Sequence, residues 1–138
     1  MLPFPIGRFE GTGHWTNLTA EGDYTVVYVI AATPEDGSEH SVHRVFLKPD
    51  GSTLYEEPST LTFAPAERNR FRVTIRSAQG EVHGSGYWFD RQCHYEVDIA
   101  ADNHLEWTFT LGPEKIEGLA SSTNQGNFTS WRETLERV

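Results

Sequence analysis

The stretch QCHYEVDIAADNHLEWTFTL (92–111) decides the fold class. Apolar and polar residues alternate on both sides of the turn sequence Ala-Asp-Asn, which is the pattern of two antiparallel strands joined as a hairpin. With Asn103 in a left-handed conformation closing a three-residue loop, Val97 lies opposite Trp107 and Tyr95 lies opposite Phe109. One face of this hairpin is apolar and the other is polar, and a one-residue shift would mix them.

The next two turns extend the same apolar face. The turn sequence GPEK (112–115) continues it to Ala120, and NQGN (124–127) places Ala120 opposite Trp131. The same alternation puts Glu133 on the apolar face, which indicates a polar group inside the fold.

Similar turn sequences recur about every ten residues along the chain, and helical periodicity is hard to find. We therefore predict one all-β domain covering residues 1–138. The expected architecture is an antiparallel up-and-down β-barrel of about ten strands without a helical lid.

The composition excludes several classes of function. A net charge of −9 disfavours nucleic acid and anionic membranes as partners, because both need a basic face. A single cysteine cannot form an internal disulfide, and no apolar run reaches the length of a membrane span. The N-terminal sequence has no basic region followed by an apolar one, so we expect a cytoplasmic protein. A homodimer is left open.

Cys93 and His94 are adjacent, which raises the question of a nucleophilic pair. Neighbours on a strand point to opposite faces, so these two side chains cannot meet. Cys93 is interpreted as a core residue. The outer row of His94, Glu96 and Asp98 has no further ligand at a recognisable spacing. We interpret it as a solvated face and predict no metal.

The sequence GTGHW (11–15) contains Gly13-His14-Trp15, which resembles the Gly-x-Trp motif of the calycin superfamily of small barrels. The resemblance implies a lipocalin-like barrel that binds a ligand, in which Trp15 closes one end. It also implies that a basic residue of the last strand, Arg132 or Arg137, lies across that tryptophan. The helices and disulfides of typical members are missing, so the resemblance specifies no ligand or cofactor.

A candidate site comes from the early strands. Pairing through PEDG (34–37) places Tyr28 beside His43, and pairing through KPDG (48–51) places His43 beside Glu57. Buried polar groups of this kind need each other or a ligand as partners. The predicted ligand-binding residues are Tyr28, His43, Tyr55, Glu57, Phe63, Trp88 and Trp107. A register shifted by one residue, with Arg44 and Glu56 inside, remains the alternative.

Three functions fit these features. The leading hypothesis is a carrier or sensor of a small apolar or amphipathic molecule. The second is an enzyme of isomerase or lyase type, with His43 as acid or base oriented by Glu57. The third is a packed barrel that acts only through its surface.

Overall fold

The computed structural model describes residues 4–32, 40–47, 50, 52–56, 60–77 and 80–138, with 53–56, 60 and 77 described by their backbone alone. In this part the chain forms eleven β-strands and no helix. The strands are β1 (Gly7–Asn17), β2 (Glu21–Ala32), β3 (His40–Leu47), β4 (Thr53–Glu56), β5 (Thr60–Pro65), β6 (Arg70–Ser77), β7 (Gly80–Phe89), β8 (Gln92–Ala100), β9 (Asn103–Leu111), β10 (Lys115–Asn124) and β11 (Asn127–Arg137). Among the described residues, no helix is long and apolar enough to cross a membrane.

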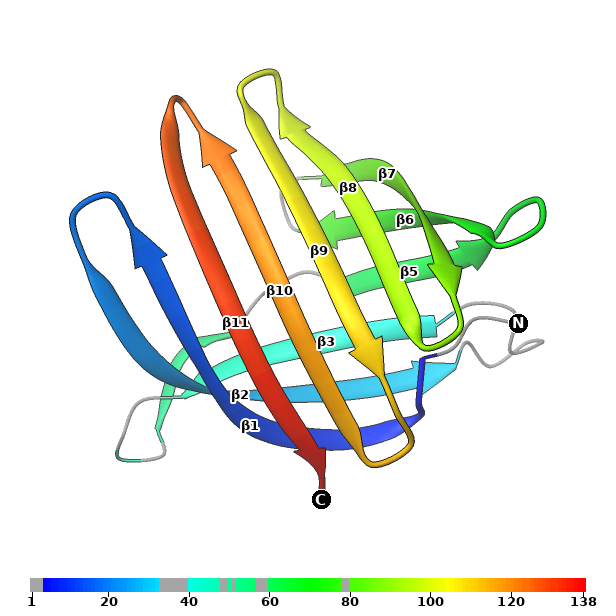
Figure 1. The fold of residues 1–138 in the computed structure, drawn as a ribbon, viewed down its shortest axis with the longest axis horizontal. Coiled ribbons are helices and arrows are strands. Elements are labelled where there is room, and N and C mark those ends of the chain that lie inside the picture. The colour runs from blue at the N-terminus through cyan, green and yellow to red at the C-terminus, as the bar shows by residue number, and fades with distance from the viewer. Residues whose placement is uncertain (1–3, 33–39, 48–49, 51, 57–59, 78–79) are drawn as a thin grey trace.

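The strands form a single antiparallel sheet that closes on itself. β2 pairs with β1 on one side and with β3 on the other, which completes the ring. β3 pairs with β5 near its start and with β4 near its end, so β4 and β5 share one place in the ring. Eleven strands with one shared place give ten positions, and the predicted all-β barrel is confirmed. Figure 1 shows β8–β11 passing in front of β2, β3, β5 and β6.

The C-terminal hairpins have the predicted register. Ala120 lies opposite Trp107 on one side and opposite Trp131 on the other. The β8–β9 pairing differs by two residues, because Tyr95 lies opposite Trp107 rather than Phe109. A bulge between Asp98 and Ala100 absorbs the difference. Since an even shift keeps every side chain on its face, the predicted inward and outward sets remain correct.

The predicted register between β2 and β3 is wrong by one residue. Tyr28 lies opposite Arg44, and His43 lies opposite Val29. Valines occupy both faces of these strands, so the alternation did not distinguish the two registers. Arg44 is buried in the barrel, as in the alternative register, and His43 turns to the outer face.

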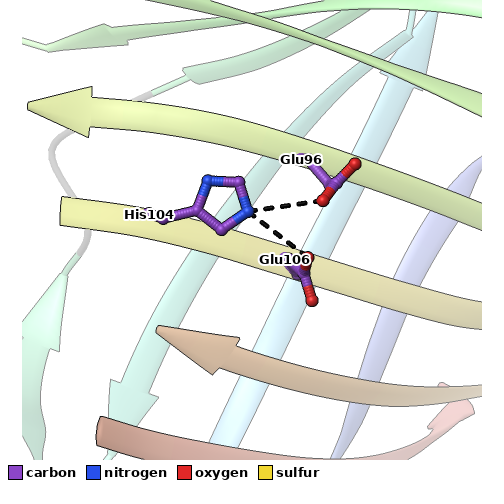
Figure 2. Close-up of side chains that lie close together, drawn as sticks. All are labelled: Glu96, His104 and Glu106. Atoms are coloured by element: carbon purple, nitrogen blue, oxygen red, sulfur yellow. Dashed lines mark hydrogen bonds and ion pairs between the residues drawn. The ribbon is translucent and has the colours of Figure 1, made fainter. Parts of the chain in front are cut away.

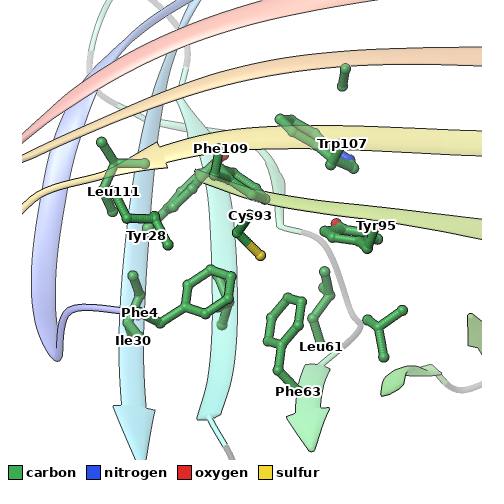
Figure 3. Packing of buried hydrophobic residues seen from close by; sticks show 14 of the residues in the cluster. Phe4, Tyr28, Ile30, Leu61, Phe63, Cys93, Tyr95, Trp107, Phe109 and Leu111 are labelled. Carbon is green, nitrogen blue, oxygen red and sulfur yellow. The ribbon is translucent and has the colours of Figure 1, made fainter. Parts of the chain in front are cut away.

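Aromatic side chains fill one end of the barrel (Figure 3). Phe4 stacks on Phe63 with ring centroids 4.4 Å apart and also contacts Phe109. Phe9 is fully buried, and the Arg137 guanidinium lies 4.7 Å from its ring centroid. Arg137 also donates to the carbonyl oxygens of Ile6 and Pro113, which ties the last strand over this end.

The expected role of Trp15 is therefore wrong. Trp15 stands near the end of β1 and is only half-buried, whereas the cation of the last strand covers Phe9 near the start of β1. Arg132, the other residue considered for this contact, is exposed on the outer face. Phe9 and Arg137 make the contact that the resemblance implied for Trp15.

The inward facing of Cys93 predicts low reactivity of its thiol. The side chain is inaccessible, and burial raises its pKa to about 12. We expect native protein at pH 8 to react with Ellman's reagent far more slowly than protein unfolded in guanidinium, because the thiolate is the reacting form. Reaction of the native protein at the rate of a free thiol would contradict the inward orientation of Cys93. The Cys93→Ser variant, which has no thiol, gives the background signal of the assay.

Candidate functional site

A pocket of about 470 Å³ occupies the end of the barrel opposite Phe9. Its walls come from strands far apart in the sequence, and most of its lining is apolar or aromatic. The lining residues are Trp15, Tyr24, Arg44, Phe46, Leu61, Ile75, Tyr95, Ile99, Asn103, Leu105, Trp107, Ser122, Asn124 and Trp131. Asn103 and Asn124 stand at the turns of their hairpins, so these turns form part of the rim.

Arg44 is the only charged residue among these lining residues. Its side chain is 10% exposed, and three aromatic rings surround it. The Cζ atom lies 4.5 Å from the ring centroid of Trp107, 4.9 Å from that of Phe46 and 5.3 Å from that of Tyr28. Such cation–π contacts are strongest where water is excluded, so the rings hold the guanidinium in place.

Glu133 balances this charge from β11. Its carboxylate is fully buried, and Oε2 accepts a hydrogen bond of 2.7 Å from Nη2 of Arg44. Oε2 also accepts from the Tyr24 hydroxyl at 2.5 Å, and Oε1 accepts from the Tyr28 hydroxyl. A buried carboxylate needs several donors to offset its lost hydration. Three side chains from two strands supply them.

The two tyrosines act as donors throughout the ordinary pH range. Burial is the main cause that raises the pKa of Tyr24, and the nearby charge of Glu133 raises it further. Burial likewise raises the pKa of Tyr28 well above its ordinary value, although the positive charge of Arg44 opposes this shift. Both hydroxyls therefore keep their protons and donate to Glu133.

A glycine lets Tyr24 reach Glu133 across the intervening strand. Gly13 lies between them in the sheet, opposite Tyr24 on β2 and opposite Glu133 on β11. A β-carbon at position 13 would overlap the Tyr24 ring. The glycine of the Gly-x-Trp motif thus provides the space that the polar cluster requires.

The structure separates the predicted ligand-binding residues. Trp107 lines the pocket, whereas Tyr28 and Phe63 lie deeper, toward the filled end. Trp88 is half-buried and packs against Phe71 outside the pocket lining.

Among the remaining predicted residues, His43 does not face the barrel interior. His43 lies on the outer face of β3, opposite the exposed Val29. The backbone of Tyr55 pairs with Phe46 rather than with Val45, which is again a shift of one residue. Glu57 lies outside the described residues.

Sequence reasoning did not join Arg44 to Glu133. The alternation had already placed Glu133 on the inner face, and an isolated buried carboxylate requires a cation. That requirement would have selected the register with Arg44 inside.

The buried ion pair predicts a specific pattern of stability. Arg44→Met leaves Glu133 charged without its cation, and we expect a loss of about 3–5 kcal/mol in unfolding free energy, the usual cost of removing one partner. Adding Glu133→Gln to Arg44→Met should recover much of this loss, because the double variant buries no charge. Urea unfolding followed by circular dichroism measures both values.

Arg132→Met is the matched control on the outer face of β11, with an expected change of roughly 0.5 kcal/mol or less. A loss below about 1 kcal/mol for Arg44→Met would show that the pair does not support the fold.

No family model and no curated protein matches this chain. Solved structures match its fold. Rv2717c from M. tuberculosis has a TM-score of 0.72 at 12% identity, over 96% of this chain and 92% of that chain. The S-type phycobiliprotein lyase CPES from Guillardia theta has a TM-score of 0.74 at 11% identity, over 96% of this chain and 88% of that chain.

A protein of unknown function of the DUF3598 family from Nostoc punctiforme has a TM-score of 0.67 at 13% identity. That match covers 96% of this chain and 47% of the other. At these identities the likeness shows the fold alone. The chain is similar to these proteins as an all-β barrel.

Proposed function

We propose that this protein binds a small, largely apolar molecule that carries a hydrogen-bond acceptor. The observation that carries the proposal is the aromatic-lined pocket with Arg44 at its inner end. Its volume of about 470 Å³ falls within the range of roughly 300–1,000 Å³ that is usual for small-molecule sites.

The lining indicates the kind of molecule that fits. Trp15, Trp107 and Trp131 present indole rings to the pocket, and such surfaces favour flat or aromatic ligands through stacking. The guanidinium of Arg44 carries five N–H donors and no acceptor. A carbonyl, carboxylate or sulfonate oxygen on the ligand is therefore the complementary group.

The energetic cost of the ion pair supports a binding role. A buried pair such as Arg44–Glu133 contributes little stability compared with apolar residues of the same volume. Selection for folding alone would favour the apolar residues. We infer that the Arg44–Glu133 pair serves to orient a ligand in an otherwise apolar pocket.

The enzymatic alternative no longer has a candidate for its acid or base. That hypothesis required His43 inside the barrel with Glu57 beside it, and His43 lies on the outer face. The described residues that line the pocket include no histidine. Binding without catalysis is the function that the geometry supports best. A cytoplasmic location and a homodimer stay predictions from the sequence.

Two neighbouring serines on β10 allow a matched test of the pocket. Ser122 lines it, whereas Ser121 belongs to the outer surface. The probe is 1-anilinonaphthalene-8-sulfonate, which combines aromatic rings with an anionic acceptor. We expect its fluorescence to rise on binding native protein. Ser122→Phe should weaken the affinity about tenfold or more, since the added ring occupies the pocket, while Ser121→Phe leaves it unchanged.

Thermal unfolding of both variants controls for partly unfolded protein, which also binds this dye. Equal affinity of the two variants would place the dye elsewhere and would count against the pocket. Native mass spectrometry of the purified protein then identifies any ligand that copurifies.

A further inference from the structure

A second group of polar side chains lies on the outer face of the β8–β9 hairpin. His104 Nε2 lies 3.3 Å from Glu96 Oε1 and 3.3 Å from Glu106 Oε1 (Figure 2). The ligand atoms of these three residues all lie within 4.8 Å of one another. This group is separate from the barrel interior, because its side chains point away from Tyr95 and Trp107.

Asp98 orients the imidazole. Its Oδ1 atom lies 2.7 Å from His104 Nδ1 and accepts the hydrogen bond that the Nδ1–H donates. In the neutral ring this hydrogen bond leaves the lone pair on Nε2, which faces the two glutamates. A carboxylate behind a histidine in this way is the usual outer partner of a metal-binding histidine.

The β8–β9 register brings two carboxylates together beside the imidazole. Glu96 and Glu106 lie directly opposite each other, and both contact His104. The residues opposite this pair on the adjacent strands are Ser85 on β7 and Ser121 on β10, neither of which is charged.

Two of the three distances between the ligand atoms fit the geometry of zinc. Bonds of about 2.0–2.1 Å from zinc to nitrogen and oxygen imply edges of roughly 3.3–3.4 Å between the ligand atoms of a regular tetrahedron. Both measured distances from His104 Nε2 to a glutamate oxygen are 3.3 Å. Imidazole and carboxylate ligands together suit zinc and similar transition metals better than magnesium or calcium, which prefer oxygen alone.

We propose that His104, Glu96 and Glu106 bind a divalent transition-metal ion of the zinc type on the outer face of the hairpin. Asp98 is a positioning residue, and water completes the coordination. The ion clamps β8 to β9 below the turn. Because Ile99 and Asn103 of the same hairpin line the pocket, the clamp steadies part of its rim.

The chain contains a matched control in His14. Its Nδ1 lies 2.7 Å from Asp23 Oδ1, which repeats the orienting contact of His104. Its Nε2 has Glu21 at 3.8 Å. His14 therefore offers the same oriented imidazole with a single, more distant glutamate.

The test is calorimetric titration of chelator-treated protein with zinc chloride at pH 7.5. We expect one equivalent to bind, His104→Gln to lose about tenfold or more in affinity, and His14→Gln to leave it unchanged. Glu106→Gln should also weaken binding, and magnesium chloride should not compete. Zinc should raise the thermal midpoint of the native protein and of His14→Gln, but not that of His104→Gln.

Absence of saturable zinc binding would overturn the proposal, as would equal affinity in native protein and His104→Gln. Equal losses in His14→Gln and His104→Gln would assign the effect to general surface charge and would also overturn it. His104 is partly exposed, so its substitution should preserve the fold, and Glu106→Gln gives a second variant of the same site.

Discussion

The buried carboxylate of Glu133 decides how this barrel closes. It stands on β11, and its donors stand on β2 and β3. An ionised group without water needs these donors in place at once, because each missing hydrogen bond leaves a large desolvation cost. A shift of β3 by one residue would turn Arg44 outward and leave Glu133 without its cation. The ion pair therefore selects the register at which β2 and β3 complete the ring.

The cluster of Glu133 and its three donors divides the barrel interior into a filled end and a hollow end. On one side of it, Phe4, Phe63 and Phe109 pack ring against ring. On the other side the walls stand apart and leave the pocket. The guanidinium of Arg44 belongs to both regions, since it lies over Tyr28 toward the filled end and also faces the pocket. A polar group at this boundary keeps the hollow end from being purely apolar, which gives it a means of orienting a bound molecule.

The hairpins from β9 to β11 could be predicted from the sequence because each has a tight turn and one clearly polar face. The β2–β3 pairing could not be predicted in this way. Val27 and Val29 lie on the same face of β2, yet Val27 is buried and Val29 is 41% exposed, so apolar residues on this strand do not mark which face points inward. The pocket was predicted only as an interior with aromatic walls, and Trp107 is the predicted residue that lines it. Arg44 was placed inside only in the alternative register, because the register was set from turn lengths rather than from the charge that Glu133 requires. His104 was missed because the bulge between Asp98 and Ala100 shifts β9 by two residues and brings His104 opposite Asp98.

The β8–β9 hairpin shows how strand alternation lets one short segment carry two chemistries. Tyr95 and Trp107 face the pocket, while Glu96 and Glu106, one residue away from each, meet on the outside. The two faces share one backbone, so the register of the hairpin positions both groups. Glu96 and Glu106 both contact His104 on the outer face, so an ion bound by the three side chains joins β8 to β9 beside the rim of the pocket. The register of this one hairpin therefore positions both the outer cluster and one wall of the pocket.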